Sequence, residues 1–81
     1  MKLLGKLEDE NDGYRFDFQS DVSAEGDFRE AREKLGINSE RVNWSDNFAV
    51  TLGTVLGMDR RELIDFREYL AQNKDWEYDE P

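Results

Sequence analysis

The feature that most constrains the fold is a strict alternation of aromatic and charged residues. Tyr14, Phe16 and Phe18 are separated by single charged residues, and a period of two places the aromatic rings on one face of a β-strand. Residues 2–7 form a candidate strand before it. The intervening residues 8–13, EDENDG, are rich in types that favour turns. The sequence therefore predicts an N-terminal β-hairpin with one buried face.

A helix is predicted over residues 27–35, with Ser23 as an alternative start. The apolar residues of this segment recur at helical spacing, at Phe28, Ala31 and Leu35. Asp27 followed by Glu30 is a capping-box pattern. Gly36 then provides a C-terminal stop, because glycine readily adopts the left-handed conformation that ends many helices.

A second helix is predicted from Asp59 to about Asn73. Asp59 is the expected N-cap, and Glu62 is the matching capping-box residue. The apolar stripe of this helix consists of Leu63, Phe66 and Leu70. Residues 75–81, DWEYDEP, follow as an acidic and aromatic C-terminal tail. We therefore expect a single α+β domain over residues 1–74 and a tail beyond it.

Residues 41–56 fit two structures. Their β-branched content favours a second hairpin that turns at residues 45–47. The alternative is a helix over residues 45–56, whose apolar face would consist of Phe48, Leu52, Val55 and Leu56. We prefer the helix, because residues 49–68 resemble a known two-helix motif. The predicted fold class is α+β, a small single domain with an N-terminal β-hairpin followed by two or three helices.

The motif that residues 49–68 resemble is the helix-turn-helix, and the resemblance covers about a quarter of the chain. Apolar residues stand where such motifs make contacts between helices, at Leu52, Leu56, Met58, Leu63 and Phe66. Gly53 stands where the helices cross, and Gly57 stands at the turn. The stretch VLGMDRREL is similar to the turn region of many bacterial regulators.

The resemblance implies that the second helix of this motif enters the major groove of DNA. The exposed positions of that helix are Asp59, Arg60, Arg61, Asp65 and Glu68. Three of these five residues are acids, which opposes an approach to phosphates. The two arginines are the features that support DNA binding.

The chain carries 20 acidic and 11 basic residues, a formal net charge of −9. Such a surface opposes direct binding to nucleic acid and attracts a basic protein partner. Because carboxylates on a rigid scaffold can imitate phosphates, the expected partner is a nucleic-acid-binding enzyme or complex. The candidate partner-binding residues are Asp9, Asp12, Asp17, Asp21, Asp27, Glu30, Glu33, Asp75, Trp76, Glu77, Tyr78, Asp79 and Glu80.

The tail alternates acids with aromatic residues. Trp76 and Tyr78 are residue types that anchor interfaces, and the flanking acids would steer them to a basic site. The alternative is that Trp76 packs back onto the domain. A further alternative for the whole acidic surface is that it serves solubility alone.

The chain contains few residues that could support catalysis or bind a metal. The absence of histidine and cysteine removes the usual general bases, activated nucleophiles and thiolate metal ligands. Glu8, Glu10, Asp12 and Gly13 imitate half of a calcium loop, but Gln19 stands where the bidentate glutamate is required. We therefore expect no enzyme activity, no metal and no cofactor.

The sequence also predicts a cytoplasmic protein without a membrane partner, and it leaves the oligomeric state open. No apolar run approaches the roughly 20 residues that span a bilayer. An anionic lipid leaflet would repel the acidic surface.

The leading functional hypothesis is a small acidic, non-enzymatic binding protein that inhibits a basic nucleic-acid-handling partner by charge or nucleic-acid mimicry. Phage- and plasmid-type inhibitors of CRISPR or restriction machinery are similar in size and charge. The alternatives are a helix-turn-helix transcriptional regulator and an antitoxin or immunity-type protein that neutralises a basic toxin. The mimic and the antitoxin share their physics and differ only in the partner.

Overall fold

The computed structural model describes residues 1–10, 13–38, 41–47 and 50–79. Within these residues the elements follow in the order β1 (Lys2–Leu4), β2 (Glu8–Glu10), β3 (Gly13–Ser20), α1 (Glu25–Leu35), β4 (Arg41–Asn47), β5 (Val50–Leu56), α2 (Arg60–Asn73) and β6 (Glu77–Tyr78). Strands near the N-terminus precede the helices, so the predicted α+β class is confirmed.

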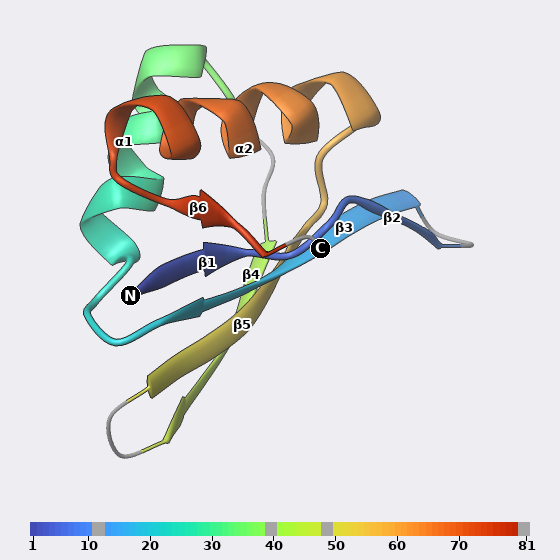
Figure 1. Ribbon diagram of the computed structural model, residues 1–81. Coiled ribbons are helices and arrows are strands. Elements are labelled where there is room, and N and C mark those ends of the chain that lie inside the picture. The colour runs from blue at the N-terminus through green and yellow to red at the C-terminus, as the bar shows by residue number, and fades with distance from the viewer. Residues whose placement is uncertain (11–12, 39–40, 48–49, 80–81) are drawn as a thin grey trace.

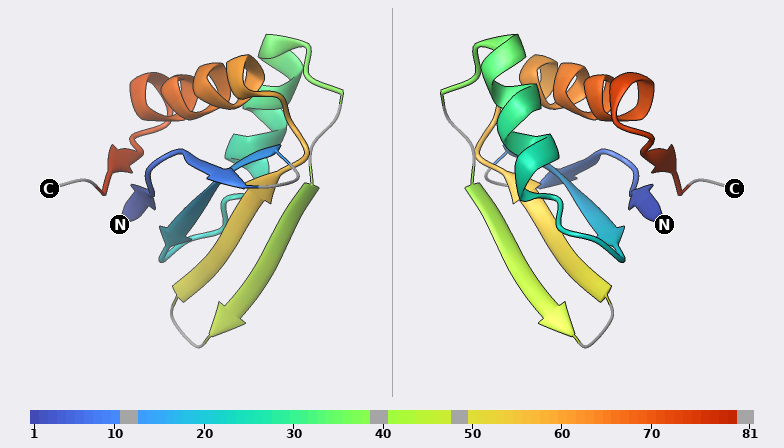
Figure 2. Two further views of the ribbon diagram at one scale, coloured as in Figure 1. Left: turned by 90° about the vertical axis from the view of Figure 1, so that its right-hand side faces the viewer. Right: turned by 90° about the vertical axis from the view of Figure 1, so that its left-hand side faces the viewer.

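The strands form one mixed sheet in the order β4-β5-β3-β1-β6, with β2 paired to β3. The pairs are antiparallel except for β1 with β6, which run parallel. Both helices cover the same face of the sheet, and the β4–β5 hairpin extends beyond them (Figure 1, Figure 2). No element among the described residues covers the opposite face, which we call the open face.

The alternation in β3 produces the core in the predicted way. Phe16 and Phe18 are buried under the helices, and their rings meet aromatic residues from other elements. The ring centroid of Phe18 lies 4.8 Å from that of Phe28 on α1, and the Phe28 ring lies 5.4 Å from that of Phe66 on α2. Edge contacts of this kind join the two layers.

The N-terminal hairpin is confirmed, with strands that reach further into the predicted turn than expected. β1 and β2 both pair antiparallel with β3. Between them the amide of Gly5 donates a hydrogen bond of 2.7 Å to the carbonyl oxygen of Asp17. The predicted turn over residues 8–13 is correct only in part, because Glu8–Glu10 and Gly13 belong to strands. Residues 11–12 lie outside the described chain.

Helix α1 begins earlier than the capping pattern predicted. Its N-cap is Ala24, without a side-chain cap, so the capping box assigned to Asp27 and Glu30 is wrong. Both carboxylates instead bind groups outside the helix. The predicted stop is confirmed: Gly36 has a φ of 68°, and the amide of Ile37 donates to the carbonyl of Arg32 at 3.0 Å.

Helix α2 matches its prediction. Asp59 caps the helix, and the capping box with Glu62 is complete. Leu63, Phe66 and Leu70 are each fully buried. The helix ends at Asn73, as expected.

Residues 41–47 and 50–56 are strands, so the preferred helix over residues 45–56 is wrong and the alternative, a second hairpin, is correct. The turn predicted at residues 45–47 is wrong, because these residues belong to β4 and pair with β5. The helix-turn-helix prediction falls with it, because its first helix is strand β5. Four of the seven residues of β5 are β-branched, and such side chains suit a pleated strand better than a helix. The contact predicted for Phe48 lies outside the described residues.

The C-terminal segment is part of the fold as far as it is described. Trp76 is only 2% exposed, and its ring stacks on Phe28 with centroids 5.6 Å apart. Strand β6 pairs with β1 in the register Leu3 to Glu77. Of the two interpretations of Trp76, the structure has the one in which it packs onto the domain.

Candidate functional site

Two acids of α1, Asp27 and Glu30, contact groups of other elements of the fold. The Asp27 carboxylate accepts hydrogen bonds from Lys2 Nζ at 2.8 Å and from Trp76 Nε1 at 2.9 Å. Burial raises the pKa of Asp27, but the bonds from Lys2 and Trp76 outweigh it and hold that pKa below its ordinary value of 3.8. Asp27 therefore fastens both ends of the described chain to the helix.

Glu30 has a similar role one turn further along the helix. It accepts a hydrogen bond of 2.7 Å from the Tyr69 hydroxyl and an ion pair of 2.9 Å from Lys74 Nζ. These two contacts hold the pKa of Glu30 below its ordinary value of 4.5. Glu33, predicted to lie along the same side, is exposed. Of the three acids in the predicted band, Glu33 is exposed, and Asp27 and Glu30 are held by contacts within the fold.

The other predicted acids are spread over several surfaces. Asp9 on β2 is exposed. Asp21 contacts the Met1 ammonium group, whose hydrogen bond lowers the pKa of Asp21. Asp75 is exposed and has a φ of 61°. Asp12 and Glu80 lie outside the described residues.

Strand β6 divides the acidic and aromatic residues of the C-terminal segment between different surroundings. The Arg67 guanidinium lies over the Tyr78 ring, 4.5 Å from the centroid of that ring. Glu77 and Asp79 are exposed. The amide of Asp79 donates a hydrogen bond of 2.8 Å to the carbonyl of Leu4. This bond holds Asp79 beside β1. Glu77 and Asp79 therefore lie along the edge of the sheet and not in a free tail.

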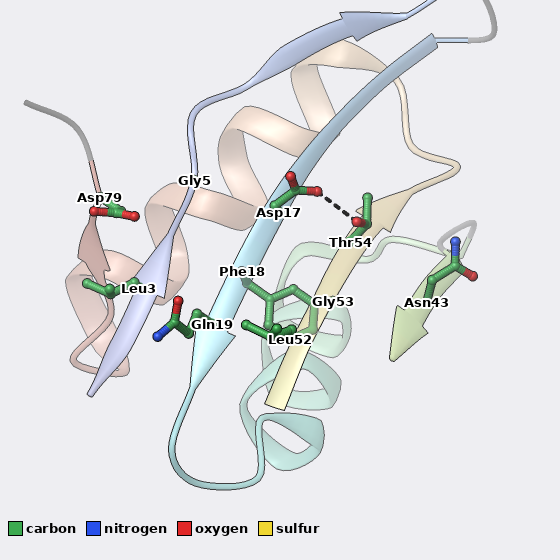
Figure 3. Close-up of a pocket in the computed structure, with 10 residues that line it drawn as sticks. All are labelled: Leu3, Gly5, Asp17, Phe18, Gln19, Asn43, Leu52, Gly53, Thr54 and Asp79. Atoms are coloured by element: carbon green, nitrogen blue, oxygen red, sulfur yellow. Dashed lines mark hydrogen bonds between the residues drawn. The ribbon is translucent and has the colours of Figure 1, made fainter. Parts of the chain in front are cut away.

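The structure brings Asp17 and Asp79 together in a hollow of about 480 Å³ on the open face. Figure 3 shows the hollow from the open face, with the helices behind the strands. The ring of Phe18, which also lines the hollow, is buried on the helical side. The hollow is lined by Leu3, Gly5, Asp17, Phe18, Gln19, Asn43, Leu52, Gly53, Thr54 and Asp79. We call this site the sheet hollow.

The sheet hollow follows from the period of two in β3. With Phe16 and Phe18 under the helices, Asp17 and Gln19 face the other way. The register pairs Asp17 with Thr54 and Gln19 with Leu52, and the Thr54 hydroxyl donates to Asp17 at 2.7 Å. This bond fixes the direction of one carboxylate.

Gly5 lines the sheet hollow between Asp17 and Asp79 (Figure 3). A Cβ atom on Gly5 would lie 2.9 Å from the carbonyl oxygen of Asp17, closer than carbon and oxygen normally approach. Glycine therefore allows the chain after β1 to lie tightly against β3. The close approach leaves backbone, and no side chain, between Asp17 and Asp79.

Sequence reasoning found the acids of this site and missed its remaining residues. Asp17 and Asp79 were among the predicted partner-binding residues, while the apolar and amide residues were not. The missed residues are Leu3, Gly5, Phe18, Gln19, Asn43, Leu52, Gly53 and Thr54. The alternation in β3 already assigned Gln19 to the face away from the core. The helix preferred for residues 45–56 concealed the contribution of β5.

Two kinds of feature are absent from the described part of the chain. The described side chains contain no group of three or more histidine, cysteine, aspartate or glutamate residues placed to hold a metal ion. Within residues 1–10, 13–38, 41–47 and 50–79, no helix combines the length and apolarity needed to cross a membrane. Comparison of the chain with protein-family models, with curated proteins and with solved structures gave no match.

Proposed function

We propose that this chain is a non-enzymatic binding protein that inhibits a basic, nucleic-acid-handling protein by occupying the surface that would otherwise hold nucleic acid. The net charge of −9 supports a basic partner. We also propose that it acts in the cytoplasm, where such partners work.

The observation that carries this proposal is the gathering of exposed acids on the open face. Asp17 and Asp79 line the sheet hollow. Glu77 pairs in register with Leu3, which lines the same hollow, so its side chain belongs to the same face. Carboxylates from distant parts of the sequence thus meet on one sheet, where the strands hold them in fixed positions. A rigid array of negative charge is what a phosphate-binding groove accepts.

The test begins with capture of the partner by the tagged full chain in host-cell extract. The captured protein is then purified, and its binding to labelled duplex DNA and RNA is measured with increasing amounts of the chain. We expect the partner to bind nucleic acid alone and to release it as the chain is added. The control is the chain with nucleic acid and no partner, for which we expect no complex.

Three results would contradict the proposal. One is a captured partner that has no affinity for nucleic acid. Another is a complex in which the partner holds nucleic acid and the chain together, because mimicry requires the two to exclude each other. The third is a specific complex of duplex DNA with the chain itself, which the charge of the surface opposes.

A further inference from the structure

We propose that the sheet hollow binds an arginine-bearing extended segment of the partner protein. This inference rests on the proposed function, which supplies a basic partner, and it assigns the contact to the open face instead of helix α1. It also names the side chain that the contact recognises.

The lining of the sheet hollow includes two leucines, Leu3 and Leu52, which pair with Gln19 from either side, and two acids. Leu52 is 41% exposed, and Leu3 lines the same space. Asp17 and Asp79 stand on either side of Gly5. An arginine side chain matches both parts, because its aliphatic stem packs on leucine while its guanidinium donates to carboxylates.

The remaining polar groups favour arginine over lysine. Gln19 and Asn43 supply amide oxygens, and Thr54 already donates to Asp17. A guanidinium presents five N–H donors in a planar fork, so it can bind a carboxylate and an amide oxygen together. An ammonium group is more strongly hydrated and loses more on entering such a partly apolar site.

Charge within the described chain agrees with a cationic occupant. Among the described residues, the side chains of Glu77 and Asp79 have no hydrogen-bond or ion-pair partner. Asp17 accepts a hydrogen bond from the neutral Thr54 hydroxyl. No ion pair with another described residue compensates its negative charge. The nearest cation of β3 on this face, Arg15, is paired with Glu8 at 3.4 Å.

The size of the sheet hollow indicates a segment longer than one residue. About 480 Å³ lies within the range of roughly 300–1,000 Å³ typical of ligand sites. An extended chain directs alternate side chains to the same side, so one arginine can reach Asp17 while the next-but-one residue lies near Asp79. A segment of about three residues fits this arrangement.

The experiment uses the blocked peptide acetyl-Arg-Arg-Arg-amide as a probe and the full chain labelled with ¹⁵N. Peptide is added while amide chemical shifts are recorded, and the same titration is made with the tri-lysine and tri-citrulline peptides. We expect the largest shifts at residues that line the sheet hollow, tighter binding of arginine than of lysine by about threefold or more, and no binding of citrulline.

Two double variants locate the contact. The double variant Asp17→Asn with Asp79→Asn removes both negative charges from the lining of the sheet hollow. It keeps a side-chain oxygen at position 17 that can accept the hydrogen bond from Thr54. Asp65→Asn with Glu68→Gln removes two charges from α2 on the helical side and serves as the matched control. We expect the first pair to weaken binding of the tri-arginine peptide about three- to tenfold and the second pair to change it less than about twofold.

Several outcomes would overturn the inference. These are shifts spread evenly over the acidic surface, equal losses in the two double variants, equal binding of the arginine and lysine peptides, or no binding at millimolar peptide. The proposed function can fail separately. If the peptide binds the sheet hollow but the captured partner does not compete with nucleic acid, the function is wrong. If Asp17→Asn with Asp79→Asn still displaces nucleic acid like the parent, the assigned contact is wrong.

Discussion

At position 53 the absence of a single carbon atom decides how the sheet packs. A Cβ on Gly53 would lie 2.5 Å from the carbonyl oxygen of Asn43 and 2.6 Å from Cε1 of Phe18. The sequence correctly indicated that this position needs a small residue. It gave the wrong reason, because the close neighbours are a strand and an aromatic ring, and not a crossing helix.

We predict that Gly53→Ala destabilises the protein by about 1–3 kcal/mol, since the backbone of β4 and the packed Phe18 ring cannot both move away. Gly26 in α1 is the matched control, because nothing lies within 4 Å of a Cβ placed there. We expect Gly26→Ala to leave stability unchanged or to raise it by up to about 1 kcal/mol. Urea unfolding of the three proteins measures both effects, and equal stability of the two variants would contradict the packing described for β5.

Asp27 gives the stability a dependence on acid pH. Its pKa in the folded protein lies below the ordinary value of 3.8, so its ionised form stabilises the fold above that value. The stabilisation is lost as the pH falls through the folded pKa. We predict that Asp27→Asn is less stable than the parent at pH 7 and that the difference shrinks below about pH 4. Unfolding curves at a series of pH values test this, and a difference independent of pH would refute it.

At the scale of elements, the segment after α2 behaves as a structural part of the sheet. Trp76 fills a place in the aromatic core, and its ring nitrogen binds Asp27. We predict that Trp76→Ala lowers the free energy of unfolding by roughly 3–5 kcal/mol. Tyr78→Ala is the control, because Tyr78 is 45% exposed and its contact with Arg67 accounts for at most about 1 kcal/mol. Similar losses in thermal or urea unfolding would mean that Trp76 is misplaced.

The elements differ in how far the sequence could predict them. β3 and α2 carry complete local signals, an alternation of aromatics in one and a capping box with an apolar stripe in the other. Residues 50–56 carry conflicting signals: β-branching favours a strand, while Leu52 and Leu56 also fit a helical stripe. Long-range pairing with β3 decides the conflict, and such pairing is not written in the local pattern.

At the scale of the whole molecule, charge should control how fast the partner is found. We predict that affinity for the captured partner falls about tenfold or more between roughly 50 and 300 mM salt, because screening reduces steering by the charge of −9. The measurement is surface plasmon resonance with separate association and dissociation rates. Most of the loss should appear in the association rate. An affinity insensitive to salt would assign the interface to apolar contact.

The sheet hollow belongs to the whole molecule, which is why sequence reasoning found only its acids. Asp17 and Asp79 come from opposite parts of the chain. Thr54 comes from a segment that was predicted as a helix, and Asn43 comes from the strand that pairs with it. Composition showed that acids would be abundant on the surface. It did not show that two of these acids, Asp17 and Asp79, would line one hollow on either side of Gly5.

The parallel pairing of β1 with β6 also affects folding during synthesis, because the two strands lie far apart in the sequence. Glu77, the partner of Leu3, is synthesised 74 residues after it. At translation speeds of about 5–20 residues per second, the first strand waits on the order of ten seconds for that neighbour. Until then Phe28 lacks the stacked ring of Trp76, so this part of the core stays open until residues 76–78 have been synthesised.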